Sequence, residues 1–211
     1  MTERRKKRQI RAVGDRFDKQ KTYKEQMEKY SLAIRHGFFL EAIMIDYACM
    51  EDRLRYMLYY LGVFEKESDY KVKGKSNRVQ CFRDILHDYV DPKMKMSITT
   101  ISGKRSIVRS VFHMAGAAER PNSSETQRSL LWSSLHDEKH ISEIMQLLDE
   151  IENWCEYRNE IVHCLLNKNL ESLHEQLQQK AEEGYTLFRR LDSQVHWVKR
   201  KRLREKMKMP T

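Results

Sequence analysis

The strongest pattern in this sequence is a long run of residues, about 140–167, in which apolar side chains recur three and four positions apart. That spacing places them along one face of an α-helix. The apolar positions of the run are Ile144, Leu147, Leu148, Ile151, Trp154, Cys155, Ile161, Val162 and Leu165. The 211 residues include only seven Gly and three Pro, so few positions interrupt helices. We therefore expect an all-α protein, a helical bundle of about five to seven helices.

Shorter helical patterns fill most of the remaining chain. We expect one helix to begin near Tyr23 and to end near Gly37, and others over 38–61, 76–89, 104–118, 124–135 and 169–206. In 38–61 the expected buried stripe consists of Leu40, Met44, Tyr47, Leu54 and Leu58. Glu51 lies within this stripe, whereas Asp46 is expected to point elsewhere on the helical wheel. A β-prone stretch at 97–101 has no second strand to pair with.

The chain is expected to form one domain with basic ends. Residues 1–20 are a basic N-terminal extension, since positions 4–8 read Arg-Arg-Lys-Lys-Arg. Residues 21–206 form a single helical domain, within which 62–124 is an inserted helical region. Residues 207–211 form a tail.

The cysteines and the apolar runs indicate the compartment. Cys49, Cys81, Cys155 and Cys164 show no Cys-x-x-Cys spacing, and three of them lie inside apolar helical patterns. Buried free thiols in a reducing compartment fit this distribution. The N-terminus has no apolar signal region, and no uncharged run reaches membrane-spanning length. We therefore expect a cytoplasmic protein with no membrane partner.

The charge balance points to a polyanionic partner. The net charge is +9, which favours RNA, DNA or an anionic lipid without choosing among them. Basic residues cluster near the C-terminus at Lys199, Arg200, Lys201, Arg202 and Arg204. These side chains are candidates for contacts with phosphates, and Tyr185 and Trp197 nearby are candidates for stacking on bases. A solubilising surface is the alternative interpretation of the same charges.

One cation interrupts the apolar stripe of 140–167. Arg158 follows Trp154 by four residues and precedes Ile161 by three. A guanidinium that faces a core needs an anionic partner or a polar cleft, because it cannot lose its charge. Glu51 is the expected partner, since it also lies in an apolar stripe. His163 lies about 140° around the helix from Arg158, at the edge of the stripe.

Residues 158–163 read Arg-Asn-x-x-x-His. This motif resembles the signature of the HEPN family (higher eukaryotes and prokaryotes nucleotide-binding), in which an Arg is followed after four to six residues by a His. Such short motifs also occur by chance. Arg189 and Arg190 precede His196 at similar spacing, but they lack the Asn and the apolar surroundings. The resemblance implies a small all-α domain, a metal-independent ribonuclease of toxin–antitoxin, abortive-infection or CRISPR systems, and two domains paired across one cleft.

These residue types suit RNA cleavage by attack of the ribose 2′-hydroxyl on the adjacent phosphate. The imidazole of His163 can accept or donate the proton. The guanidinium of Arg158 can neutralise the charge of the phosphorane. Asn159 can hold the tautomer of the His or bind a phosphate oxygen, and Glu51 can orient Arg158. Cleavage would leave a cyclic phosphate and a 5′-hydroxyl.

One His cannot be base and acid at the same moment. The resemblance therefore implies a homodimer that supplies two Arg/His sets, with RNA as substrate and no cofactor. A regulatory protein or antitoxin is a further possible partner.

Besides one motif that we set aside, two other interpretations stay open at this stage. His136 and His140 have the spacing of a zinc-protease helix, but Asp137 occupies the position of the required Glu and no third ligand is evident, so we expect no metal site. A non-catalytic module could bind RNA through its basic ends, with Arg158 in a purely structural role. A HEPN-like interaction partner that neutralises or scaffolds another component is the second of these alternatives.

Overall fold

The computed structural model describes residues 16–61, 100–116, 135, 137–164 and 170–207. These residues form helices and contain no strand, so the predicted all-α fold is confirmed for them. The helices are α1 (Arg16–Arg35), α2 (Phe39–Tyr60), α4 (Ile101–Gly116), α6 (Glu138–Cys164) and α7 (Leu170–Met207). Each lies close to a predicted helix, although α1 already begins inside the segment assigned to the basic extension. The predicted helix 76–89, and 124–135 apart from its last residue, lie outside the described residues.

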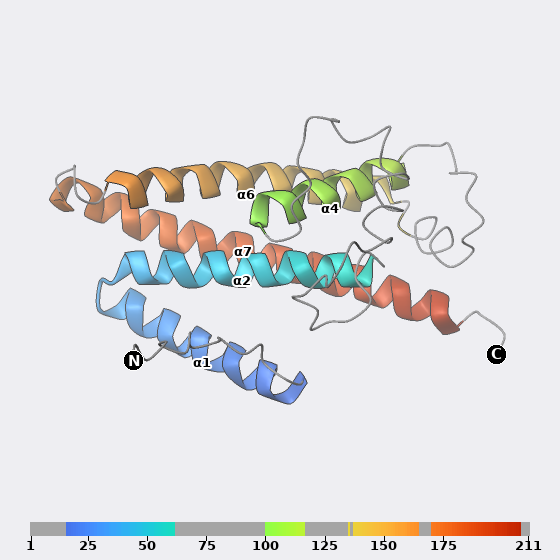
Figure 1. Cartoon of the computed structure of the whole chain (residues 1–211), viewed down its shortest axis with the longest axis horizontal. Helices are drawn as coiled ribbons and strands as arrows, with labels where there is room; N and C mark the ends of the chain where they lie inside the picture. Colours follow the sequence, from blue (N-terminus) through green and yellow to red (C-terminus); the bar gives the residue numbers. More distant parts are fainter. Residues whose placement is uncertain (1–15, 62–99, 117–134, 136, 165–169, 208–211) are drawn as a thin grey trace, which may run out of the picture.

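The long helices α1, α2, α6 and α7 lie side by side along the length of the molecule (Figure 1). α1 and α2 run antiparallel, as do α6 and α7, and the most extensive contact is between α2 and α7. The shorter α4 packs against α2 and α6. α2 therefore lies at the centre of the bundle, in contact with α1, α4 and α7.

The predicted break near Gly37 is a helix end of defined geometry. Gly37 has a φ of 74°, a left-handed conformation that glycine adopts without steric cost. The N–H of Phe38 donates to the carbonyl of Ala33 at 2.8 Å, and the N–H of Gly37 donates to that of Ile34 at 3.2 Å. This pair of bonds is the Schellman arrangement that ends a helix. It reverses the chain and makes α1 and α2 an antiparallel pair.

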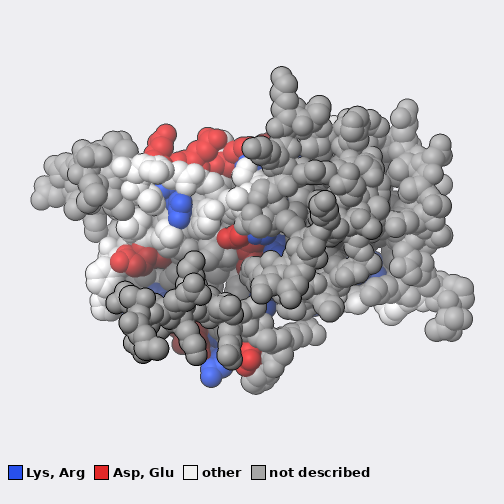
Figure 2. All heavy atoms as spheres, viewed as in Figure 1, with Lys and Arg blue, Asp and Glu red and all other residues white. Residues whose placement is uncertain are grey.

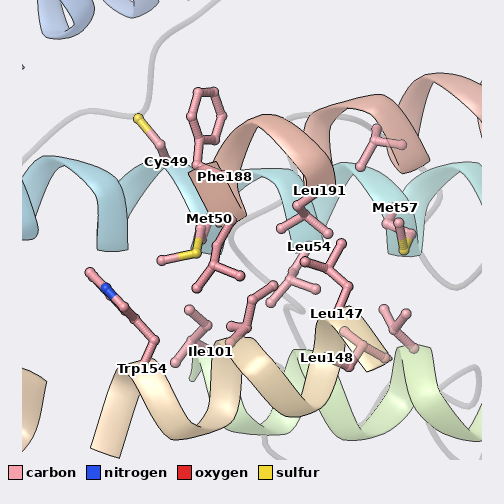
Figure 3. Packing of buried hydrophobic residues seen from close by; sticks show 14 of the residues in the cluster. Cys49, Met50, Leu54, Met57, Ile101, Leu147, Leu148, Trp154, Phe188 and Leu191 are labelled. Atoms are coloured by element: carbon pink, nitrogen blue, oxygen red, sulfur yellow. The ribbon is translucent and has the colours of Figure 1, made fainter. Parts of the chain in front are cut away.

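The core lies where α2, α4, α6 and α7 meet (Figure 3). Its largest fully buried side chains include Trp154, Phe112, Phe188, Ile43, Met50, Leu54 and Met57. The predicted stripe of α6 is confirmed at Ile144, Leu147, Leu148, Ile151, Trp154 and Ile161. Val162 is different, because 39% of it is exposed.

The predicted stripe of α2 is confirmed at Leu54 and Leu58, but its first half is displaced by one residue. The buried positions of that half are Phe39, Ala42, Ile43, Asp46, Cys49 and Met50. Met44, expected inside, is 42% exposed, whereas Asp46, expected to point elsewhere, is 0% exposed. One residue corresponds to about 100° of rotation. α2 has apolar residues in both registers, and its packing against α7 selects one of them.

Gly184 allows α6 and α2 to approach α7 closely. A Cβ atom at this position would lie 2.6 Å from Cζ2 of Trp154 and 2.9 Å from Oδ2 of Asp46. Neither side chain can move away easily, because both are buried. The indole Nε1 of Trp154 also donates to the carbonyl of Lys180 at 2.9 Å, one turn before the glycine.

We predict that Gly184→Ala destabilises the protein by about 1–3 kcal/mol, because the added methyl displaces Trp154 or Asp46 from a packed core. This cost exceeds the gain in helix propensity that Ala brings. Urea unfolding followed by circular dichroism measures the free energy. Ser193→Ala, at an exposed position of the same helix, is the control and should change stability by less than about 0.5 kcal/mol. Equal stability of the two variants would contradict the close approach.

Candidate active site

Arg158 is held against α2 by contacts that do not neutralise it. It is half-buried on α6, and its guanidinium carbon lies 4.5 Å from the ring centroid of Tyr47. One NH2 group donates to Oδ1 of Asn159 at 2.9 Å, and the other contacts Sδ of Met44 at 3.1 Å. None of the carboxylates in the described part of the chain pairs with it. The cation is therefore oriented by a ring, an amide and a thioether, and its charge remains available to an anion.

Asn159 and His163 lie on the solvent-facing part of α6. Both are exposed, and His163 is in the last turn of the helix. Asn159 accepts a hydrogen bond from Arg158, and no described interaction connects it to His163. The expected support of the His tautomer by Asn159 is thus replaced by support of the guanidinium. Because Arg158 faces α2 while His163 is exposed about 140° around the helix, one protomer does not bring the two into direct contact.

The predicted pair between Glu51 and Arg158 is wrong. The carboxylate of Glu51 lies 2.6 Å from Nζ of Lys104, on α4. Lys104 is only 4% exposed, so an acid next to it offsets the cost of burying its charge. The physical reason for the difference is position along α2, because Glu51 lies one turn beyond Tyr47 on the same side of the helix, level with Lys104 of α4. Tyr47 and Met44 are the α2 residues that contact Arg158.

Two arginines of α4 are also paired with acids, Arg105 in a buried position and Arg109 in a half-buried one. Arg105 forms an ion pair with Glu152, and Arg109 forms one with Asp149, both on α6. Burial lowers the pKa of Arg105, while Glu152 opposes that shift. α4 therefore connects α2 to α6 through ion pairs.

The predicted RNA-binding cations of α7 have two kinds of surroundings. Arg202 donates to the carbonyl of Tyr59 and lies 4.7 Å from its ring. Lys199 lies 5.7 Å from the Tyr60 ring, and Lys201 lies 5.4 Å from that of Trp197. Arg200 and Arg204 are exposed. None of the five is paired with a carboxylate within the described segments, so this end of α7 carries unneutralised positive charge.

Sequence analysis did not identify Asp46 as a buried acid. Both of its carboxyl oxygens are buried without a hydrogen-bond partner among the described residues. Burial raises the pKa of Asp46 to about 8, so the carboxyl is largely protonated at neutral pH. Its spacing from Ile43, three residues earlier, and from Met50, four residues later, is the signal that could have identified it.

Other features concern metals, cysteines and membranes. In the described ranges, no group of three His, Cys, Asp or Glu side chains could hold a metal ion. His140 instead stacks near Trp197, with ring centroids 4.5 Å apart, while His136 lies outside these ranges. Cys49 and Cys155 are free thiols. Among the described helices, none has the length and apolar character needed to cross a bilayer.

No protein-family model, curated protein or solved structure matches this chain. The resemblance to HEPN domains therefore depends on the residues at 158–163 and on the all-α fold.

We predict that Glu51 is coupled to Lys104 and not to Arg158. In a double-mutant cycle, Glu51→Ala and Lys104→Met should deviate from additivity by about 1 kcal/mol, because both remove the same ion pair. Glu51→Ala and Arg158→Met should be additive within about 0.5 kcal/mol. The measured quantity is the free energy of unfolding in urea. A larger coupling in the second cycle would restore the pair expected from sequence.

We also predict that Asp46 makes stability decrease with rising pH. The folded carboxyl has its pKa raised to about 8, whereas the unfolded one ionises near pH 4. Between about pH 4 and pH 8 folding therefore takes up a proton at this carboxyl. The contribution of Asp46 to the free energy of unfolding falls as the pH rises through this window and is constant above it. Asp46→Asn should melt several degrees above the parent at about pH 9 and should gain less at about pH 5. Glu25→Gln, an exposed acid, should show no such difference, and parallel curves for parent and Asp46→Asn would refute the prediction.

Proposed function

We propose that this protein is a HEPN-like, metal-independent endoribonuclease that acts as a homodimer, in microbial defence or toxin–antitoxin control. The observation that supports this proposal most is the surroundings of Arg158. It is half-buried and oriented by Tyr47, Met44 and Asn159, yet no acid among the described residues neutralises it. A structural Arg at such a position usually has a carboxylate partner. An Arg held without one is prepared for an anion such as a phosphate.

Each residue has a distinct role in this proposal. The guanidinium of Arg158 stabilises the charge that develops on the phosphorane. His163, exposed in the last turn of α6, accepts the proton of the 2′-hydroxyl or donates a proton to the leaving 5′-oxygen as its bond to phosphorus breaks. Asn159 fixes the orientation of Arg158 through its side-chain carbonyl. The chain's own residues supply the acid, the base and the positive charge, so no metal takes part in the proposed reaction.

A second protomer completes the proposed site. Since Arg158 and His163 of one chain lie on different sides of α6, a cleft that holds both types of side chain needs two copies. An exposed apolar surface next to Arg158 supports such pairing. Leu32, Phe38 and Met44 line an open cavity of about 550 Å³ between α1 and α2, and Met44 contacts Arg158 directly. Exposed apolar patches of this kind are typical of protein interfaces.

The acidic outer face of α6 restricts how RNA approaches. Figure 2 shows Asp and Glu side chains along the upper edge of the molecule, over α6. Glu156 and Glu160 are exposed near His163. Repulsion between these carboxylates and phosphates favours an approach from the side of α2, where Arg158 lies.

A non-catalytic RNA-binding module is the second candidate. The observation that favours it is the separation of Arg158 and His163 within one chain, together with the unneutralised cations of α7. In that case the basic residues bind RNA without cutting it. RNA incubated with the parent or with a His163 variant then keeps the same length and the same ends.

We predict that His163→Ala and Arg158→Ala each reduce RNA cleavage in EDTA by at least about 100-fold, because each removes a group that acts in the transition state. Parent protein should cut total RNA to fragments with 2′,3′-cyclic phosphate and 5′-hydroxyl ends. The 5′ ends are detected because a polynucleotide kinase labels them without prior phosphatase treatment. His113→Ala and Arg189→Ala, both at exposed positions elsewhere, are the controls and should cut as the parent does.

Mixing experiments test the dimer. Arg158→Ala and His163→Ala proteins, each inactive, are unfolded together, refolded and assayed. A heterodimer retains one Arg158 and one His163 in its shared cleft and should recover part of the activity. If the mixture stays inactive while light scattering shows dimers, the two residues act within one chain. If all variants cut as the parent does, the enzyme proposal fails and the RNA-binding alternative remains.

A further inference from the structure

A cavity of about 780 Å³ opens between the first half of α1, the second half of α2 and the C-terminal half of α7. This volume is in the range of pockets that bind small ligands. Five Lys or Arg side chains and three Tyr side chains line it, and no Asp or Glu does. The chemistry of the lining therefore favours an anionic ligand that also has flat, stackable parts.

The acids behind the cavity neutralise only part of its charge. Nζ of Lys19 lies 2.8 Å from Asp52, and Arg53 lies 3.1 Å from Asp192. These two cations are thus bound into the bundle. Lys21, on α1, and Lys199, on α7, both line the cavity and have no carboxylate partner within the described ranges. An anion bound there gains two charge-assisted contacts.

The tyrosines of the cavity alternate with its cations. Nζ of Lys19 lies 4.0 Å from the ring centroid of Tyr56, and the guanidinium of Arg53 lies 4.6 Å from that of Tyr23. Lys199 lies 5.7 Å from the Tyr60 ring. These cation–π contacts hold the aromatic side chains at the cavity wall. A positively charged groove with aromatic side chains is the arrangement that binds unpaired nucleotides, since phosphates meet cations and bases meet rings.

The cavity is separate from the candidate active site. Tyr47 contacts Arg158, whereas Tyr56 lines the cavity. Nine residues correspond to about 180° of rotation around α2. The two sites therefore lie on opposite sides of the central helix, and none of the residues that contact Arg158 lines the cavity.

We propose that this cavity binds an unpaired stretch of an RNA strand, with Lys21 and Lys199 on its phosphates and with Tyr60 and Tyr56 against its bases. The choice of RNA over other anions rests on the proposed function, but the site does not depend on cleavage. It anchors a strand away from the reacting phosphate. The anchor binds without sequence preference, because neither phosphates nor stacked bases are read by sequence.

The test measures binding in the absence of cleavage. All proteins are full-length and carry His163→Ala, so that a failure of the nuclease proposal does not affect the result. A fluorescent single-stranded oligoribonucleotide is titrated at several salt concentrations. Lys21→Ala with Lys199→Ala should weaken binding several-fold and reduce the slope of log affinity against log salt by about 1.4, since two phosphate contacts are lost. Lys139→Ala with Arg189→Ala, both exposed outside the cavity, removes the same charge and should have a smaller effect.

Further arms test the aromatic contacts and the ligand class. Tyr60→Leu should weaken binding of the single strand without changing the salt slope, because stacking and not charge is lost. An RNA duplex should bind more weakly than the single strand and should be insensitive to Tyr60→Leu. The proposal is overturned if the two charge-matched double variants lose the same affinity. It is also overturned if inorganic phosphate or a mononucleotide competes as strongly as the oligonucleotide, because the site then recognises a free anion and not a strand.

Discussion

The packing around Gly184 is the constraint on which the rest of the bundle depends. The missing side chain lets the indole of Trp154 and the carboxyl of Asp46 approach the α7 backbone. Trp154 donates to the carbonyl of Lys180, and the hydroxyl of Tyr30 donates to the carbonyl of Ala181 at 3.3 Å. α1, α2 and α6 are thus all positioned on the same two turns of α7. Close packing transmits this arrangement along each rigid helix, so one point sets three helix registers.

These registers determine which cations are neutralised. Once α2 and α6 are in place, their acids meet α4, where Lys104 and Arg105 are paired with Glu51 and Glu152. Arg158 and Lys199 meet rings instead of acids. A ring orients a cation without cancelling its charge. The positive charge that can attract a polyanion therefore belongs to Arg158, to α1 and to the end of α7, even though α4 is also rich in basic residues.

The candidate site shows how far single-sequence reasoning reaches. The unusual position of Arg158 follows from the periodicity of α6 alone, and the structure confirms that it is half-buried. Its partner does not follow, because Tyr47 and Glu51 lie one turn apart on the same side of α2, and periodicity does not show which of them is level with Arg158. The error of one residue in the buried face of α2 instead hides Asp46, whose raised pKa is a consequence of burial.

The sequence by itself determined the helices, the turn at Gly37 and the buried face of α6, because these depend on residues within a few positions of one another. The tertiary structure decided the buried face of α2, the partner of Glu51 and the basic cavity between α1, α2 and α7. Such features join residues that are distant in the chain: Glu51 and Lys104 are 53 positions apart, and Met44 and Arg158 are 114. No local pattern specifies which distant side chains meet, since that is settled only when whole helices pack.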